Sequence, residues 1–256
     1  MCGRYAITTA PEAMRRLFGY PQMPNFPPRY NVAPTQPIPV VRLHEGQRQF
    51  VLMRWGLIPS WVKDPKGFTL LINARGESAI EKPAFRNAMK RRRCLIPADG
   101  FYEWKRDGAI KRPHLIRFRE GAPFAFAGLW ETWTGPNGEE VDTAAIVTTQ
   151  ANRVLMPIHD RMPVILPPEA YEMWLDCANV DAKTASALLV PAQDDLFETF
   201  EISPAVNRVA NDGAEIQTPY TAPPVDDAAT AAKPVRKTAA RKTAKPKADE
   251  RQKTLF

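Results

Sequence analysis

The second residue of the chain is a cysteine whose position gives it a chemistry that Cys94 and Cys177 lack. Methionine is normally removed before a small second residue, and loss of Met1 would leave Cys2 with an α-amine and a thiol on adjacent carbons. The unperturbed pKa values of these groups, about 7.7–8.0 and about 8.5, leave both partly nucleophilic at neutral pH. An aldehyde can condense with the amine to an imine, on which the thiol can close a five-membered thiazolidine. Position alone does not separate this chemistry from an incidental cysteine.

Three further segments carry polar side chains that a reaction could use. Asn73 and Arg75 alternate with apolar neighbours, so they share one face of an extended segment. Glu103 stands between two large aromatic residues, where partial burial would raise its pKa and suit a proton donor. His159 begins a His-Asp-Arg triplet between prolines, which combines a base, an acid and a phosphate-binding fork. A polar strand face, a surface glutamate and a solvated turn are the plainer interpretations.

Other patterns in the sequence bear on several classes of protein. The three cysteines are far apart and form no CxxC pair, so neither a disulfide framework nor a metal site is expected. The chain has no GxGxxG or P-loop motif, and we expect no cofactor. No stretch approaches the run of about 20 apolar residues that a membrane helix needs, and the N-terminus has no signal pattern. We therefore expect a cytoplasmic protein without a membrane partner, associated with the nucleoid if its source is bacterial.

The order of the expected elements favours an α+β fold. Helices are expected over 11–18, 84–93 and 168–175, and many prolines between 21 and 39 exclude long regular elements there. Strands are expected over 40–43, 50–53, 115–118, 124–130 and 144–149, with turns at 45–46 and 136–138. Strands joined by hairpins, with helices at the periphery, predict a single domain over 1–219 around a mostly antiparallel sheet or partly closed barrel.

The composition changes after residue 219, and 220–256 are expected to form a disordered tail. Alanine, proline, threonine and lysine dominate there, so little apolar area is available to offset the ordering entropy. Nine basic and two acidic residues give the last 24 residues the whole net charge of +7, which leaves none for the body. The tail ends in Gln252, Leu255 and Phe256, which resemble the Gln-x-x-Leu-Phe peptide that docks bacterial repair proteins on the sliding clamp.

The motifs together resemble the SRAP family of SOS-response-associated peptidase-like, or abasic-site processing, proteins. Seven motifs occur in the family's order over about 1–218: Cys2-Gly3-Arg4-Tyr5, Arg29-Tyr30-Asn31-Val32-Ala33-Pro34, Trp55-Gly56, Ile72-Asn73-Ala74-Arg75 with Glu77, Ala98-Asp99-Gly100-Phe101-Tyr102-Glu103-Trp104, Ile158-His159-Asp160-Arg161-Met162-Pro163 and Ser203-Pro204-Ala205-Val206-Asn207. No catalytic position departs from the pattern. The basic tail lies outside this resemblance.

The resemblance implies a role for each matching residue. Cys2 would be the nucleophile, Asn73 would hold its amine or the linked sugar, Glu103 would move protons, and His159 would aid sugar ring-opening and reversal of the link. Phosphates would be contacted by five residues: Arg4, Asn31, Arg75, Thr148 and Arg161. Pro34 and Trp61 would form an apolar wedge or stacking surface that favours single strands.

The function implied is covalent capture of abasic sites in single-stranded DNA, and we expect a monomer. Two alternatives use the same residues. An N-terminal cysteine with asparagine, glutamate and histidine could serve a cysteine peptidase, limited to removal of its own Met1 or acting on peptides. A non-catalytic DNA-binding protein would give no covalent product.

Overall fold

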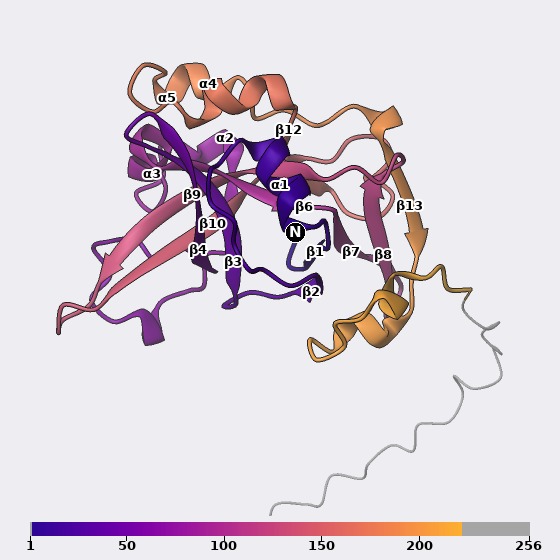
Figure 1. The fold of residues 1–256 in the computed structure, drawn as a ribbon. Coiled ribbons are helices and arrows are strands. Elements are labelled where there is room, and N and C mark those ends of the chain that lie inside the picture. The colour runs from indigo at the N-terminus through magenta and orange to yellow at the C-terminus, as the bar shows by residue number, and fades with distance from the viewer. Residues whose placement is uncertain (1, 222–256) are drawn as a thin grey trace, which may run out of the picture. The chain divides into compact units, whose positions relative to one another are not determined.

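The computed structural model describes residues 2–221. Met1 and residues 222–256 lie outside the described part, and with them the expected tail and the predicted clamp residues Gln252, Leu255 and Phe256. The tail and its boundary therefore stay predictions. Within the described residues the chain forms two β-sheets with short helices around them (Figure 1).

The first sheet has five strands in the order β13-β8-β7-β1-β2, and every pairing in it is antiparallel. Its strands are β1 (Tyr5–Ile7), β2 (Arg29–Val32), β7 (Gly100–Asp107), β8 (Ile110–Phe118) and β13 (Phe197–Glu201). The short β1 lies between β2 and β7, so the residues that precede it enter the interior of the molecule.

The second sheet closes on itself. Its strands are β3 (Pro37–His44), β4 (Gln47–Trp55), β5 (Asn73–Arg75), β6 (Arg93–Ala98), β9 (Phe124–Thr134), β10 (Glu140–Gln150), β11 (Arg161–Pro163) and β12 (Ile165–Leu166). The path β10-β4-β3-β6-β9 returns to its start because β9 also pairs with β10. The predicted α+β fold with a partly closed barrel is thus confirmed. Two pairings that the sequence did not predict are parallel, those of β10 with β4 and with β5.

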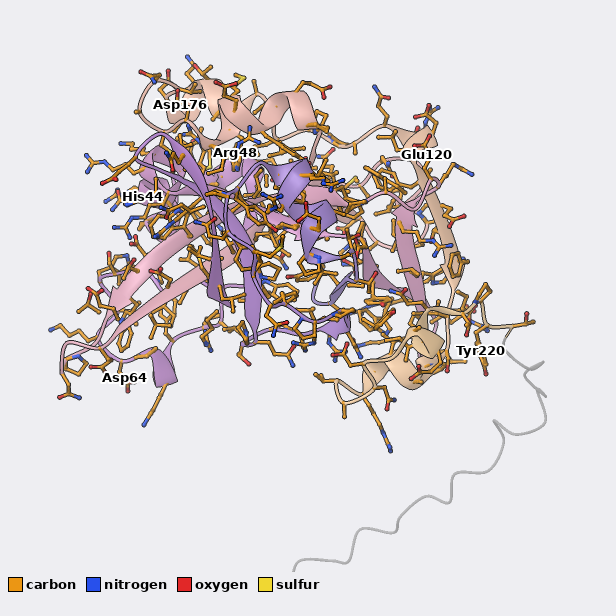
Figure 2. All side chains as sticks on the ribbon, viewed as in Figure 1. His44, Arg48, Asp64, Glu120, Asp176 and Tyr220 are labelled. Carbon is orange, nitrogen blue, oxygen red and sulfur yellow. The ribbon has the colours of Figure 1, made fainter. Side chains whose placement is uncertain are left out.

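Local turn chemistry explains the hairpins. Glu45 and Gly46 turn between β3 and β4 with positive φ angles of 50° and 75°, which only short turn residues adopt readily. Gly138, with φ of 85°, serves the turn between β9 and β10. The five predicted strand segments all lie within observed strands. In Figure 2 the labelled charged residues His44, Asp64 and Glu120 lie on the outside of the ribbon, in agreement with their exposure.

Three of the helical segments test the sequence predictions. Helix α1 (Pro11–Phe18) is confirmed, with proline in its first turn and Gly19 in the left-handed conformation after it. The third predicted helix is a 3-10 turn (Pro168–Ala170) that leads into α4 (Tyr171–Leu175). The remaining helical segments are α2 (Gly76–Ala79), α3 (Arg86–Arg91), α5 (Ala182–Ser186) and the 3-10 turns Pro65–Gly67, Asp194–Leu196, Pro204–Asn207 and Ala214–Gln217.

The predicted helix over 84–93 was too long, because Arg93 begins strand β6. Its buried guanidinium donates hydrogen bonds to the carbonyls of Met89, Trp174, Asp176 and Val180. This Arg93 staple joins α3, β6 and the end of α4 through backbone acceptors. No helix among residues 2–221 is long and apolar enough to cross a membrane.

Candidate functional site

The Cys2 side chain is completely buried at the entrance to β1. Its Sγ lies 3.6 Å from the Arg4 carbonyl, to which the thiol donates. Burial raises the pKa of the Cys2 thiol well above its usual range, and the negative charge of Glu103 raises it further. The thiol is therefore protonated at neutral pH, so it needs a base before it can act as a nucleophile.

Strand β5 places Asn73 against the backbone of Cys2. The Asn73 Nδ2 donates to the Cys2 carbonyl at 3.0 Å. Its Oδ1 is buried and accepts no hydrogen bond from residues 2–221. A buried acceptor without a donor is costly, so an N–H that reached this oxygen would be bound favourably. The parallel pairing of β5 with β10, which puts Asn73 opposite Ile146, fixes this geometry.

Strand β7 supplies the carboxyl group of the site. The Glu103 side chain is almost wholly buried, with 3% of the residue exposed. Burial raises its pKa to about 7. A carboxyl group with this pKa is protonated in about half of the molecules at neutral pH. It can both donate and accept a proton there, which is the requirement for general acid–base catalysis.

His159 lies in the loop between β10 and β11, with 27% of its side chain exposed. Burial lowers its pKa, and the positive charges of the N-terminal amine and Arg106 lower it further. Its Nδ1 accepts the Arg161 backbone N–H at 3.0 Å. The Asp160 carboxylate lies 2.9 Å from the same nitrogen. Nδ1 can accept the Arg161 N–H only when it carries no proton, and it can donate to Asp160 only when it carries one, so the two hydrogen bonds exclude each other. The lowered pKa favours the neutral ring, which places its proton on Nε2.

Two cavities meet at this histidine. One, of about 450 Å³, is lined by Glu103, Trp104, Arg106, Lys111, His159 and Asn207. The other, of about 670 Å³, is lined by Arg75, Gln150, Met156, His159, Asp160 and Arg161. His159 thus borders both cavities, and the smaller one also contains the buried Glu103. The structure thus brings together the four predicted catalytic residues, Cys2 and Asn73 by a hydrogen bond, Cys2 and Glu103 by charge, and Glu103 and His159 at one cavity.

The predicted phosphate contacts fall into an accessible and an inaccessible group. Arg75 is exposed and lines the larger cavity. Arg161 instead donates to both oxygens of Glu77 at 2.6 and 2.9 Å and to the Thr148 carbonyl at 2.7 Å. The Thr148 side chain is completely buried, and its hydroxyl donates to the Ala74 carbonyl. A phosphate would reach Arg161 only in exchange for Glu77.

Arg4 and Asn31 hold the segment that follows β13. The Arg4 guanidinium donates to Asn31 Oδ1 at 2.7 Å and to the Val206 carbonyl at 2.8 Å. Asn31 is completely buried, and its Nδ2 donates to the carbonyls of Val206, Arg208 and Asn211. The phosphate contact expected of Asn31 is therefore out of reach in this structure, because the side chain has no exposed atom. The position of these residues indicates that they support the wall of the smaller cavity.

The two predicted wedge residues lie in loops at one end of the β3–β4 hairpin. Pro34 is half-buried in the turn before β3, where Thr35 donates its backbone N–H to the Trp55 carbonyl. Trp61 lies in the loop after β4 with 56% of its surface exposed and its ring edge-on to Phe68. An exposed indole supported by a second ring can stack on a base.

Sequence reasoning missed Arg106, Lys111 and Asn207, which line the smaller cavity. The missed signal was Asp107-Gly108, a hairpin turn pattern in which Gly108 has a φ of 57°. That turn would have paired the strands on either side and placed Arg106 opposite Lys111. Among residues 2–221, no cluster of three or more histidine, cysteine, aspartate or glutamate side chains could hold a metal ion.

Comparison with known proteins finds relatives over most of the chain. The family model of the SOS response associated peptidase (SRAP) matches residues 1–209. The abasic site processing protein YoaM of Bacillus subtilis is 41% identical over 220 residues, which cover 84% of this chain and 97% of YoaM. The abasic site processing protein HMCES of Xenopus tropicalis is 32% identical over 260 residues, which cover 84% of this chain and 77% of HMCES.

Solved structures share the fold. A crystal structure of a protein from Bacteroides thetaiotaomicron has a TM-score of 0.78 at 26% identity and covers 86% of this chain and 100% of its own. One from Bordetella bronchiseptica has a TM-score of 0.70 at 28% identity and covers 79% and 100%. Family model, identity and fold agree with the motifs, and the chain belongs to the SRAP family.

Proposed function

We propose that this protein captures abasic sites in single-stranded DNA by forming a thiazolidine between the lesion and Cys2, after Met1 has been removed. The observation that carries the proposal is the contact of the N-terminal cysteine with Asn73 beside a buried carboxyl whose pKa is about 7. The relatives YoaM and HMCES are both named abasic site processing proteins, which supports the choice of an abasic site as the substrate.

The reaction uses the open-chain aldehyde of the abasic sugar. The Cys2 amine adds to the aldehyde carbon, and the resulting carbinolamine loses water when Glu103 donates a proton to its hydroxyl. The thiol then adds to the imine carbon, forming the C–S bond, and its proton passes through the Glu103 carboxylate to the nitrogen. One aldehyde and one aminothiol thus give one thiazolidine and one water, without an external oxidant or reductant. The Asn73 Oδ1, which accepts no hydrogen bond from residues 2–221, would accept an N–H from the Cys2 amine during these steps.

His159 acts on the sugar itself. An abasic site is mostly a closed hemiacetal, so a proton must move between its hydroxyl and ring oxygen before the aldehyde is available. The neutral ring, with its proton on Nε2, can donate to one oxygen at the cavity that it shares with Glu103.

Replacement of His159 by alanine is expected to slow release of the DNA from the formed link more than it slows formation. Both directions need a proton transfer at the sugar hydroxyl, but formation also draws on Glu103 for its proton transfers, so release is expected to depend more on His159. The measurement is the decay of preformed adduct under excess competing aldehyde-trapping amine, followed on denaturing gels. His44→Ala, an exposed histidine on the β3–β4 turn, is the control (Figure 2). If His159→Ala released the DNA at the wild-type rate, His159 would not have the role proposed for it.

DNA would be bound by phosphate contacts and stacking rather than by base reading. Arg75 is the accessible cation of the predicted set, and we assign Arg4, Asn31, Thr148 and Arg161 to supporting the cavity walls. The exposed Trp61, together with Pro34 in the turn before β3, would stack on a base or separate strands. Stacking on a base and separation of the strands both favour unpaired DNA, because a stacked duplex hides its base faces.

One gel tests the function. Purified protein is mixed with a single-stranded oligonucleotide that carries one abasic site, denatured and run beside the same oligonucleotide without the lesion. A shifted, heat-stable band is expected only with the lesion. Mass spectrometry of the same protein is expected to show loss of Met1 and a mass gain equal to the DNA minus one water. If the protein bound the oligonucleotide but gave no covalent product, the proposed function would fail and the protein would be a non-catalytic DNA-binding protein.

The peptidase alternative draws on the same cysteine and on the family's description. A thiol beside a carboxyl group could also carry out acyl transfer, limited to removal of Met1 or extended to peptides. It predicts release of fluorophore from N-terminally blocked peptides, and this release would have to be lost in Cys2→Ala. The two functions are separated by comparing that assay with the denaturing gel on one protein preparation.

We also propose that the C-terminal residues Gln252, Leu255 and Phe256 dock on the replication sliding clamp. A peptide of residues 247–256 is expected to bind the clamp of the source organism with micromolar affinity, since two buried apolar side chains contribute about 1.5–3 kcal/mol each and ordering the peptide offsets much of that. The measurement is a fluorescence titration beside a Leu255→Ala/Phe256→Ala peptide. Equal binding of both peptides, or no binding at high micromolar concentration, would end the idea.

A further inference from the structure

Two cationic side chains oppose each other across the β7–β8 hairpin. Arg106 on β7 is the direct partner of Lys111 on β8, and both are exposed. Both line the cavity of about 450 Å³ that also contains Glu103 and His159. Neither residue belongs to the four catalytic residues or to the set of DNA contacts that the sequence predicts.

In the neighbouring cross-strand pair of the hairpin, carboxylates balance the positive charge. Lys105 opposes Arg112, and the Arg112 guanidinium forms ion pairs with Asp107 and Glu201, each at 3.4 Å. Arg106 and Lys111, by contrast, form no ion pair with any carboxylate of residues 2–221. Like charges directly opposite each other destabilise a hairpin. An anion bound in the cavity would therefore stabilise the hairpin, because it would offset the repulsion between Arg106 and Lys111.

The rest of the cavity wall is suited to a nucleic acid strand. The Trp104 indole N–H donates to Asn207 Oδ1 at 2.8 Å, which fixes an aromatic ring beside the two cations. Aromatic rings next to cations are the usual combination in single-strand grooves. The positive charge of Arg106 also acts on His159, which shows that the cation stands close to the reacting end of the cavity.

We propose that Arg106 and Lys111 bind the phosphates of the strand on one side of the lesion, while Arg75 binds those on the other side. The strand would then run through both cavities, past His159, which borders each of them. This inference rests on the proposed function and adds to it a two-sided grip. Its consequence is that the preferred substrate carries the abasic site inside a continuous strand, and not at an end.

The test measures binding without the covalent step. Oligonucleotides carry a tetrahydrofuran residue, which lacks the aldehyde, at the 5′ end, at the 3′ end or in the middle, so that phosphates flank it on one side or both. Wild-type protein is expected to bind the internal analogue at least 10-fold more tightly than either terminal one. Arg106→Gln/Lys111→Gln is expected to weaken binding of one terminal analogue about 10-fold and leave the other unchanged. Arg75→Gln is expected to show the opposite selectivity.

The salt dependence gives a second readout. Loss of two phosphate contacts on single-stranded DNA lowers the slope of log affinity against log salt by about 1.4. The matched control is Arg86→Gln/Lys90→Gln, which removes the same two charges from exposed positions on α3. Helix α3 lies at the left of Figure 1 and strand β8 at the right. Thermal melting of each variant checks that it folds.

Three outcomes would overturn the proposal. They are equal loss on both terminal analogues, loss on the same flank in the Arg75 and Arg106/Lys111 variants, and unchanged binding in Arg106→Gln/Lys111→Gln. The outcome is independent of the covalent reaction. If wild-type protein shows these flank preferences but gives no adduct with a true abasic site, the proposed function fails and the two-sided grip stands.

Discussion

Replacement of Cys2 by alanine is expected to abolish the covalent product with abasic single-stranded DNA, to below 1% of wild type, while binding to the uncleavable tetrahydrofuran analogue is retained. Alanine keeps the amine and the Asn73 contact to the residue-2 carbonyl, but it cannot close the sulfur ring. Any imine that forms is hydrolysed on denaturation unless it is reduced. The measurement is the fraction of shifted oligonucleotide on a denaturing gel.

Two controls separate the aminothiol from simple thiol chemistry. Cys177→Ala removes a half-buried thiol outside the site and is expected to crosslink at the wild-type level. An N-terminal extension that cannot be cleaved blocks the amine and keeps the Cys2 thiol, and it is expected to crosslink as poorly as Cys2→Ala. A heat-stable adduct in Cys2→Ala, or full crosslinking by the extended protein, would contradict the thiazolidine mechanism.

Replacement of Glu103 by glutamine is expected to slow crosslink formation by roughly 10- to 1000-fold. This range overlaps the lower part of the roughly 100- to 10,000-fold that general acid–base catalysis usually contributes. The pH dependence gives the sharper result. Because the pKa of Glu103 is raised to about 7, the acid form needed to expel water is lost above this pH and the base form needed by the thiol is lost below it. Wild-type protein should therefore show a rate maximum near neutral pH that Glu103→Gln lacks.

The matched control is Glu120→Gln, an exposed glutamate that Figure 2 places at the edge of the molecule. It is expected to keep both the rate and the maximum. The rates are measured under single-turnover conditions from pH 5.5 to 8.5 with the protein in excess over the abasic oligonucleotide. A variant with the wild-type rate, or one that is slow but keeps the inflection, would assign the proton transfers to another group.

The sequence predicted well whatever depends on neighbours in the chain. The β3–β4 hairpin followed from its turn residues, and helix α1 followed from the proline in its first turn. The parallel pairings of β10 with β4 and β5 left no local signature, because parallel partners are joined by long connections of variable sequence. Arg93 was assigned to the end of a helix, yet three of its four carbonyl acceptors come from residues more than 80 positions later.

The candidate site shows the same division. Cys2, Asn73, Glu103 and His159 could be selected because each stands in a recognisable motif, and the fold brings them to one place. The burial of Glu103 was expected from its aromatic neighbours, whereas that of Asn31 was not, since the segment around Val206 that covers it is remote in the chain. Arg4 and Asn31 also donate hydrogen bonds to protein carbonyls of the 206–208 segment, which their motifs did not indicate, and their phosphate contacts stay predictions.

The buried position of Cys2 has a consequence for the order of events during synthesis. Its neighbours Asn73, Glu103 and His159 follow it in the chain by 71 or more residues, and the residue next to the Met1 peptide bond has no exposed surface once they are in place. At roughly 5–20 residues per second, at least about five seconds separate translation of Cys2 from that of Glu103. During this interval the bond after Met1 is not yet enclosed by Asn73 and Glu103, so we expect an aminopeptidase to act most readily on the nascent chain.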